Sequence, residues 1–454
     1  MRSFLVTLRA VVDAAFLVLV LLLIGLSVVV VVIPWVILLR RRSRLVDRNK
    51  LLSLQSGAHR AYQQHGATVI LYNHDSSVFD HIDLIDPSAD VQFETRIRDG
   101  FVVRAWRTPR LYDILCRGRL WETAFVVREF LTTLRLIGFA AREGVCTIKS
   151  ATHECIALRG YFVSIALGQP HVIDVAGNYE LLRRLLGYTY YLNSFYRVLG
   201  LKTIARLVNN WLLCIPLRQA FRVLGRNKNN YEHAFALGAP IERLSLVRIR
   251  VSDEFLHAEF KPPSPLKQRY ILFVARMAPE KFPFDVIEAF EQIANRIPDM
   301  DLVLIGGGPH LKVVQERSAQ STYCKRIHVI GPLPNLEVFQ WTCHATLAVE
   351  LYSGSSLVEK MLCGIPVVAY DVEWMSEVII DGYTGFLVDF RDVASLALRC
   401  LHIASAPEEA HEMGARAKAL TRIMFDRTQI IEKEDAVFRR AIAHFRSRHN
   451  AQPA

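Results

Sequence analysis

The sequence has few features that would cross-link the chain or fix a metal ion. Its eight cysteines form no closely spaced pair, which argues against disulfides and a zinc site, so we expect reduced, mostly buried thiols. Asp80, Asp83 and Asp86 recur at every third position, a spacing that matches no strong metal signature, and a solvated loop is their expected setting. We therefore expect no metal cofactor. No internal repeat is present, and the only low-complexity segment is the polar tail after Arg446.

Acidic side chains are in the minority. The chain has 55 lysines and arginines against 44 aspartates and glutamates, which gives a formal net charge of +11. No nucleic-acid-binding motif accompanies this charge, so nucleic acid is not an expected partner. A membrane surface and phosphate-bearing ligands are the expected partners of the excess cations.

A long apolar run lies near the N-terminus. Ala14–Leu39 carries no charge and is long enough to cross a hydrocarbon core of ~30 Å with some tilt. A secretory signal would have a shorter apolar region and a small-residue cleavage site, and neither fits. Basic residues are concentrated after the run, from Arg40 to Lys50, with only Arg2 and Arg9 before it. The positive-inside rule then predicts a single-pass protein of the cell (inner) membrane with the body of the protein in the cytoplasm.

The remaining ~400 residues exceed one hydrophobic core of ~150 residues and predict two globular domains. In the first domain, Thr68–Tyr72, Cys146–Lys149 and His171–Val175 are typical of buried strands. Phe125–Leu136 and Ala157–Leu167 are typical of helices. The alternation of strands and helices predicts a doubly wound α/β domain.

The domain boundaries follow from composition and periodicity. A proline-rich, stiff connector is expected near Val251–Pro265, and a long helical pattern covers Phe425–Phe445. The predicted division is a membrane anchor and basic segment at 1–50, an N-terminal domain at 60–255, a C-terminal domain at 256–424 and a final helix at 425–447.

A basic turn follows a buried strand at the start of the C-terminal domain. Tyr270–Ala275 is typical of a central parallel strand, Phe284–Arg296 is typical of an amphipathic helix, and Arg276 and Lys281 lie between them. Ligands of open α/β sheets collect at the carboxyl ends of strands, where helix N-termini already favour anions. The turn therefore indicates a site for a nucleotide diphosphate, although an isolated Arg-x4-Lys is also found as solvated surface charge.

Later strand ends in this domain carry small residues. Gly307 belongs to a glycine triplet after an apolar run, and glycine lets the backbone approach a ligand closely. Gly354, Ser355 and Ser356 offer N–H groups and hydroxyls at an expected helix N-terminus, where phosphate binds. Glu359, one turn further on, has two possible roles, which are to accept the hydroxyls of a ribose or to stabilise the helix start.

The succession of these segments from roughly Lys267 to Phe390 resembles the donor-binding half of the retaining GT-B glycosyltransferases of group 1 (family 4), and weaker similarity reaches back to about Gly144. The resemblance implies an α/β protein with the GT-B fold, in which two Rossmann-like doubly wound domains face each other across a cleft. The transmembrane helix would be an N-terminal addition. The implied substrate is a nucleotide sugar, and no cofactor or metal is implied.

The resemblance also implies roles for matched residues. Arg276 and Lys281 match the family's basic pair, which neutralises the donor diphosphate and the negative charge that develops on the leaving group. Glu359 matches the second glutamate of the family's Glu-x7-Glu motif, which favours the ribose-binding role. The first glutamate is replaced by Leu351, and Glu350 stands one residue away, where a regular strand end would point it to the opposite face.

The catalytic prediction is therefore Arg276, Lys281 and Glu359. The donor-binding prediction adds six residues, which are Gly307, Glu350, Gly354, Ser355, Ser356 and Leu357.

Acceptor-side residues are expected in the N-terminal domain. The segment Gly168–Glu180 resembles the family strand that ends in a histidine before a glycine, but this chain has Ala176 at that position. The nearby polar candidates are Asn178, Asp174, His153 and Glu154, of which Asn178 and His153 are favoured, and His74 follows the first predicted strand. A lone histidine in such a turn is more often a satisfied structural group than a catalytic one, so both readings are kept.

A second membrane feature is possible between Leu181 and Lys228. This region mixes aromatic and aliphatic residues with arginines, which suits helices with an apolar face and a cationic face on anionic lipid. The alternative is that the apolar residues belong to the core and the arginines to a solvated rim. The pattern does not separate these two interpretations.

The sequence as a whole predicts a retaining glycosyltransferase that moves a sugar from a nucleotide donor to an acceptor at the cytoplasmic membrane face. We expect a UDP-linked donor and a lipid-linked or polysaccharide acceptor. The alternative is a catalytically silent GT-B protein, in which Leu351 and Ala176 mark a decayed site and the chain acts as a membrane scaffold for a partner transferase. Retention of Arg276, Lys281 and Glu359 together favours the enzyme.

Overall fold

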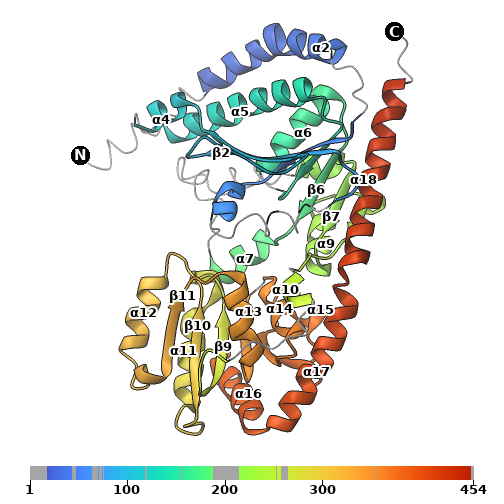
Figure 1. The fold of residues 1–454 in the computed structure, drawn as a ribbon. Helices are drawn as coiled ribbons and strands as arrows, with labels where there is room; N and C mark the ends of the chain where they lie inside the picture. Colours follow the sequence, from blue (N-terminus) through green and yellow to red (C-terminus); the bar gives the residue numbers. More distant parts are fainter. Residues whose placement is uncertain are drawn as a thin grey trace, which may run out of the picture. The chain divides into compact units, whose positions relative to one another are not determined.

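The computed structural model describes residues 18–42, 48–63, 70, 74, 76–117, 120–153, 155–187, 214–251, 253–256, 264–352 and 354–450. The chain forms two compact units. Unit 1 contains residues 1–226, 230–247 and 431–454, and unit 2 contains residues 227–229 and 248–430. Each unit is built around one sheet with helices on its faces (Figure 1).

Unit 1 contains an eight-stranded sheet of order β3-β4-β2-β1-β5-β6-β7-β8. Only the β3 and β4 pair is antiparallel, and the other neighbours are parallel. The strands are β1 (Lys50–Leu54), β2 (His81–Ala89), β3 (Phe93–Arg98), β4 (Phe101–Arg107), β5 (Thr147–Ser150), β6 (His171–Val175), β7 (Arg222–Gly225) and β8 (Leu244–Leu246).

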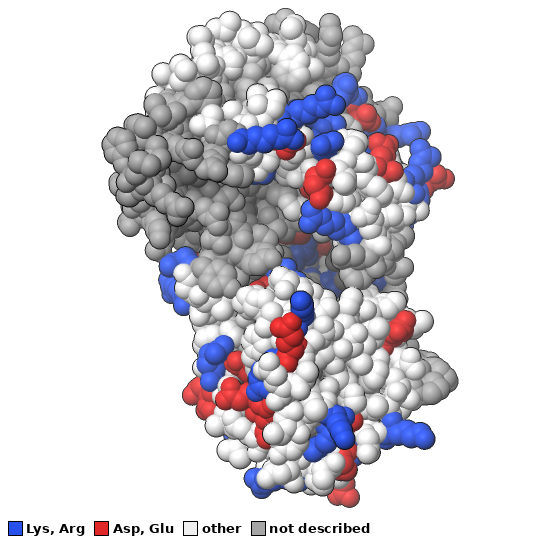
Figure 2. Space-filling model, turned by 90° about the vertical axis from the view of Figure 1, so that its left-hand side faces the viewer, with Lys and Arg blue, Asp and Glu red and all other residues white. Residues whose placement is uncertain are grey.

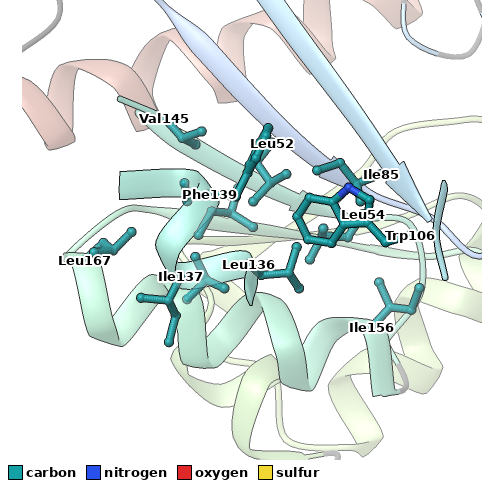
Figure 3. Close-up of a cluster of buried hydrophobic side chains, with 13 residues drawn as sticks. Leu52, Leu54, Ile85, Trp106, Leu136, Ile137, Phe139, Val145, Ile156 and Leu167 are labelled. Carbon is teal, nitrogen blue, oxygen red and sulfur yellow. The ribbon is translucent and has the colours of Figure 1, made fainter. Parts of the chain in front are cut away.

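Helices cover the sheet of unit 1 because their apolar faces need burial against it. The described helices are α2 (Ile33–Arg42), α4 (Arg110–Arg117), α5 (Trp121–Glu143), α6 (Cys155–Leu167), α7 (Tyr179–Leu186), α9 (Lys228–Ala236) and α18 (Arg427–Asn450). Figure 3 shows the core formed by α5, α6 and the central strands, in which Leu52, Ile85 and Leu136 meet the ring of Trp106. The predicted strands at Cys146–Lys149 and His171–Val175 are confirmed.

Helix α18 completes unit 1 from the far end of the chain. From Ile431 onward its residues belong to unit 1. The Glu434 carboxylate lies 2.7 Å from Nζ of Lys149 and 3.2 Å from Nη2 of Arg226, and Asp174 lies 2.5 Å from Arg226. These four charges are buried, and buried charges are tolerated only when they are paired and hydrogen-bonded. The predicted site candidate Asp174 therefore belongs to a structural ion network.

Two sequence interpretations of unit 1 are wrong. Of the strand predicted at Thr68–Tyr72, only Ile70 lies within the described residues, and it is helical. The strands that the patterns missed are β1, with its polar Lys50 and Ser53, and β2. Asp83 and Asp86 lie buried on β2 and not in a solvated loop, because Arg104 pairs with Asp83 and His59 lies 3.0 Å from Asp86. Asp80, just before β2, is exposed.

Unit 2 contains a six-stranded, fully parallel sheet of order β11-β10-β9-β12-β13-β14. Its strands are β9 (Arg269–Val274), β10 (Met300–Ile305), β11 (Ile327–Gly331), β12 (Leu347–Glu350), β13 (Val367–Tyr370) and β14 (Gly385–Val388). Its helices are α10 (Asp253–Leu256), α11 (Pro283–Ile293), α12 (Leu311–Ala319), α13 (Asn335–His344), α14 (Ser356–Leu362), α15 (Met375–Val378), α16 (Val393–Ser405) and α17 (Pro407–Met424). The predicted strand at Tyr270–Ala275 and the helix at Phe284–Arg296 are confirmed as β9 and α11.

The N-terminal apolar run is helical where it is described. Val18–Arg40 is the one helix in the described part of the chain that is long and apolar enough to cross a membrane, by length and composition only. Its last turns pack on unit 1, where Trp35 lies against Gly138 of α5 and Trp35, Val36 and Leu39 join the core shown in Figure 3. The described surface at the top of Figure 2 is largely uncharged, and the exposed apolar side chains of this helix lie mostly between Val18 and Val31, before α2.

Half of the cysteines are buried, which is fewer than predicted. All eight cysteines are free, and Cys146, Cys214, Cys343 and Cys400 are buried. Although no pair is close in sequence, the fold brings Sγ of Cys343 within 3.7 Å of Sγ of Cys363. The second predicted membrane feature, between Leu181 and Lys228, lies largely outside the described residues.

Candidate active site

The strand order of unit 2 reverses between β9 and β12. From β9 the chain moves outward to β10 and β11, which are labelled in Figure 1, and it then returns to the other side of β9 for β12, β13 and β14. In open α/β sheets, ligands bind outside the carboxyl ends of the two strands at such a switch point. The segments that follow β9 and β12 contain Lys281 and Gly354, so the topology places the predicted donor residues where this rule expects a ligand.

The basic turn after β9 is fixed by aromatic packing. Pro279–Lys281 forms one 3-10 turn, and Phe282 then adopts a left-handed φ of 52°, which is uncommon for a residue other than glycine. The Phe282 ring packs edge-on against the rings of Tyr370 and Phe390, at centroid distances of 6.2 and 5.4 Å. This packing supports the strained backbone at the residue that follows Lys281 and so fixes the turn that carries the ammonium group.

Lys281 connects the two strand ends of the switch point. Its Nζ donates a 2.7 Å hydrogen bond to the carbonyl oxygen of Tyr352, which follows β12, and lies 5.8 Å from the centroid of the Tyr352 ring. A Cβ atom on Gly354 would lie only 3.5 Å from Nζ. Glycine at 354 therefore leaves space beside the ammonium group, as a ligand phosphate would need.

The surroundings of Lys281 make its charge costly. Burial lowers the pKa of Lys281, while the carboxylates of Glu350 and Glu373 act in the opposite direction. Desolvation penalises the charged form of a lysine, and an anion at contact distance favours it. A phosphate bound beside Nζ would therefore raise the pKa of Lys281 and gain a charge-assisted hydrogen bond.

Arg276 lies beside the glycine triplet that follows β10. The N–H of Met277 donates to the carbonyl of Gly307 over 2.8 Å, which joins the two loops. A Cβ on Gly308 would lie 3.0 Å from Cγ of Arg276 and 2.5 Å from the carbonyl oxygen of Met277, so only glycine permits this approach. The Arg276 side chain is 44% exposed and pairs with Glu280.

Glu350 has a buried partner that sequence analysis missed. Its carboxylate lies 2.6 Å from Nζ of Lys360, and both side chains are 1% exposed. The Ser356 hydroxyl donates to the same Glu350 oxygen over 2.5 Å. Glu350 therefore points toward the start of α14, while Leu351 is fully buried. A lysine ten positions after a strand-end glutamate gives no local signal, because only the turn between β12 and α14 brings the two together.

The remaining predicted donor residues lie at the start of α14. Ser355 occupies the N-cap position, and the N–H of Glu359 donates to its carbonyl over 3.1 Å. Glu359 is partly buried, and the side chain of Leu357 is buried in the core. The Leu357 side chain thus packs inside unit 2, and any donor contact at this position would come from its backbone.

Residues 256–420 match the family described as "Glycosyl transferases group 1". The match covers nearly all of unit 2, including both strand ends of the switch point. Unit 2 is a group 1 glycosyltransferase domain.

Curated relatives are similar to part of this chain. A GDP-mannose-dependent α-(1-6)-phosphatidylinositol monomannoside mannosyltransferase from Mycolicibacterium smegmatis is 27% identical over 33% of this chain and 42% of its own length. Trehalose synthase from Pyrococcus horikoshii is 30% identical over 41% of this chain and 45% of its own length. The chain thus spans less than half the length of these relatives.

Solved structures extend the likeness to both units. HepE from Anabaena in complex with UDP has a TM-score of 0.61 at 15% identity and covers 86% of this chain and 99% of its own. Sucrose-phosphate synthase from Thermosynechococcus elongatus has a TM-score of 0.67 at 16% identity, over 87% and 100% of the two chains. These likenesses confirm the predicted GT-B glycosyltransferase fold.

The three predicted acceptor-side residues lie in unit 1, outside the glycosyltransferase domain. His153 packs edge-on against His233 at a centroid distance of 5.3 Å, and Nε2 of His74 lies 3.2 Å from Oε1 of Gln55. The Asn178 side chain accepts a 3.0 Å hydrogen bond from the N–H of Leu181 and so caps α7. A role in acceptor binding stays a prediction for all three. Glu154, a further candidate, lies outside the described residues.

Acidification is expected to destabilise unit 1. Burial lowers the pKa of His171 to about 3, and burial together with His233 lowers the pKa of His153 to about 3. Between pH 6.5 and 3 the unfolded chain therefore binds more protons than the folded chain, so stability falls as pH decreases through this window. Thermal unfolding of the protein from pH 7 to pH 5 should show a falling midpoint.

The matched variants for this prediction are His171→Gln and His411→Gln. His171→Gln should flatten the dependence of the thermal midpoint on pH. His411 is exposed on α17, so His411→Gln should leave this dependence unchanged. Equal slopes in the wild type and in His171→Gln would show that this imidazole does not contribute.

Proposed function

We propose that the protein is a nucleotide-sugar-dependent glycosyltransferase that acts at a membrane. The observation that carries the proposal is the position of Lys281, whose ammonium group joins the ends of β9 and β12 beside Gly354. This is the switch point of a group 1 glycosyltransferase domain, where a donor diphosphate would find a fixed cation and open backbone.

The proposed chemistry assigns charge stabilisation to the two cations. When the bond between the sugar and the diphosphate breaks, negative charge develops on the departing oxygen. Lys281, held in place by the Tyr352 carbonyl, would stabilise that charge. The half-exposed Arg276 would exchange its contact with the buried Glu280 for a phosphate oxygen. Because two cations neutralise the diphosphate, we propose that transfer requires no metal ion. Glu359 is proposed to accept the ribose hydroxyls, and Gly307 and the Gly354–Ser356 segment to approach donor oxygens with their backbone.

The proposed donor is UDP-linked, and the proposed acceptor is a lipid-linked or glycan molecule. HepE was solved with UDP and with UDP-glucose, whereas the mycobacterial relative uses GDP-mannose and acts on a phosphatidylinositol mannoside. The base of the nucleotide is therefore the first property to measure. Retention of anomeric configuration is proposed from the resemblance to the family.

The proposed location is the cytoplasmic face of a membrane, with Val18–Arg40 as a single anchor. The helix has the length and the apolar composition of a span, and arginines follow it directly. A helix near the N-terminus with these properties also fits a signal sequence, so the mature N-terminus of the purified protein should be determined. An intact N-terminus in the membrane fraction is the expected result.

A thermal-shift titration with UDP, GDP, ADP and CMP tests the donor site. A ligand at about 100 times its Kd should stabilise the protein by ~2.7 kcal/mol. One nucleotide is expected to shift the midpoint in the wild type but not in Arg276→Ala. The matched control is Lys325→Ala, since Lys325 is exposed just before β11, at the amino edge of the same sheet. No shift with any nucleotide would favour the silent scaffold.

A further inference from the structure

A cavity of about 860 Å³ lies in unit 1, at the amino ends of β6 and β7. Its lining comes from several segments that are distant in sequence. His171 begins β6, Phe221 precedes β7, Arg448 comes from the last turns of α18, and Arg40 comes from the end of α2. The cavity therefore lies at the amino ends of the strands, whereas Lys149, Asp174 and Arg226 form their ion network at the carboxyl ends. It has no part in the proposed sugar transfer.

The charge of the cavity lining is of one sign. Arg40, Arg243 and Arg448 line it, and no aspartate or glutamate is among the lining residues in the described part of the chain. Arg243 donates to the carbonyl oxygens of Arg218 and Ala220 over 3.3 and 3.2 Å, and Arg40 donates to those of Ile165 and Ala166. Neutral carbonyl acceptors orient the Arg243 guanidinium group without cancelling its charge, so the lining favours an anion.

Nearby arginines also lower the pKa values of two neighbouring groups, Arg222 and His444. The pKa of Arg222 is lowered by burial and by the nearby charges of Arg440 and Arg243. The pKa of the lining residue His444 is lowered by burial and by Arg448. Crowding of like charges is unfavourable unless a counter-ion is present, and an anion in the cavity would relieve it.

Two buried polar side chains provide an independent sign of a ligand. Gln169 and His171 line the cavity and are only 6% and 2% exposed. Oε1 of Gln169 and Nδ1 of His171 have no hydrogen-bond partner among the described residues. A buried polar atom is normally satisfied. A ligand with both acceptor oxygens and hydroxyl donors would satisfy both atoms, because a neutral histidine can donate through Nδ1 and an amide oxygen accepts.

The position of the cavity indicates where such a ligand comes from. Arg40 is the last residue of the candidate membrane span, and the cavity-lining residue Ile165 is 48% exposed on α6, one turn after Phe162, which is 42% exposed. Apolar side chains beside a cationic cavity at the end of an apolar helix match the order of a bilayer, with acyl chains followed by head groups.

We propose that this cavity binds the head group of an anionic phospholipid, with the phosphate on the arginines and head-group hydroxyls on Gln169. The inference that the anion belongs to a lipid depends on the proposed membrane anchor. The inference that the cavity prefers an anion depends on the cavity alone. The binding site would fix unit 1 against the bilayer at the end of α2. It is separate from the donor site, since all of its lining residues belong to unit 1.

The test uses the full chain in a neutral detergent and four soluble probes. Dihexanoyl phosphatidylglycerol is compared with dihexanoyl phosphatidylcholine, glycerol phosphate and inorganic phosphate by thermal shift. The anionic lipid is expected to raise the midpoint at concentrations at which the other three probes do not. Equal stabilisation by phosphatidylcholine would overturn the anion preference, and equal stabilisation by glycerol phosphate or inorganic phosphate would overturn the lipid assignment.

Two charge reversals on α18 give a matched pair of variants. Arg448→Glu changes an exposed residue that lines the cavity, and Lys433→Glu changes an exposed residue earlier on the same helix, outside the lining. Arg448→Glu should weaken the apparent affinity for phosphatidylglycerol at least about tenfold, the size of one charge-assisted contact, and Lys433→Glu should not. Equal loss in both variants, or no loss in Arg448→Glu, would overturn the site.

The nucleotide titration separates this proposal from the proposed function. Arg448→Glu should keep the wild-type nucleotide shift, because the donor residues lie in unit 2. A protein that binds no nucleotide but binds phosphatidylglycerol through Arg448 would contradict the transferase proposal and leave the lipid site intact.

Discussion

Lys281→Ala is expected to lower sugar transfer by about 100-fold or more while the protein stays folded. Removal of one preorganised donor from a site of developing negative charge costs ~100- to 1,000-fold in rate. Lys281 fits this description because its Nζ is already fixed, 2.7 Å from the Tyr352 carbonyl and beside the space left by Gly354. The measurement is initial transfer rate with saturating donor, together with the thermal midpoint of the variant.

The controls separate charge from packing. Lys281→Met keeps most of the side-chain volume and should be as inactive as alanine, whereas Lys325→Ala, at the opposite edge of the sheet, should transfer at the wild-type rate. Full turnover by a correctly folded Lys281→Ala protein would show that the switch-point lysine does not act on the donor.

Glu350→Leu is expected to destabilise unit 2 by ~3–5 kcal/mol, because it leaves Lys360 as an uncompensated buried charge. Among the described residues, the ammonium group of Lys360 has three hydrogen-bond acceptors, which are the Glu350 carboxylate at 2.6 Å and the carbonyl oxygens of Val349 and Val274 at 3.2 and 3.4 Å. Only the first of these is charged. Hydrogen exchange of the β12 and β13 amides, followed together with the thermal midpoint, reports the loss within this unit.

The double variant Glu350→Leu with Lys360→Met tests the cause. Replacement of a buried ion pair by apolar side chains of similar volume is often nearly neutral, so the second change should restore most of the lost stability. A double variant as unstable as Glu350→Leu alone would mean that the packing of this site, and not the isolated charge, controls its stability.

The architecture of unit 2 could be predicted because its signals are local. Buried parallel strands such as β9 and β10 are continuous apolar runs, and the turns after them carry the cations and glycines that the fold brings to one sheet edge. The donor-site role of Arg276, Lys281 and Gly354 can therefore be predicted from the sequence without knowledge of any long-range contact.

The parts that could not be predicted depend on partners that are distant in sequence. Asp83 and Asp86 look solvated in sequence, because their partners Arg104 and His59 are supplied by other segments of unit 1. Lys360 looks like an ordinary exposed helix residue until the turn after β12 brings it to Glu350. The left-handed Phe282 backbone likewise depends on the rings of Tyr370 and Phe390.

The discontinuous sequence of unit 1 sets an order for its biosynthesis. The ion network of Lys149, Asp174 and Arg226 needs Glu434 from α18, while residues 248–430 of unit 2 are contiguous. During translation the glycosyltransferase domain can thus be complete while the earlier-made unit still has unpaired buried charges. A chain that ends at residue 430 and has been released from the ribosome should contain a protease-resistant second unit and a protease-sensitive first one, so the half that is synthesised first would be the last to mature.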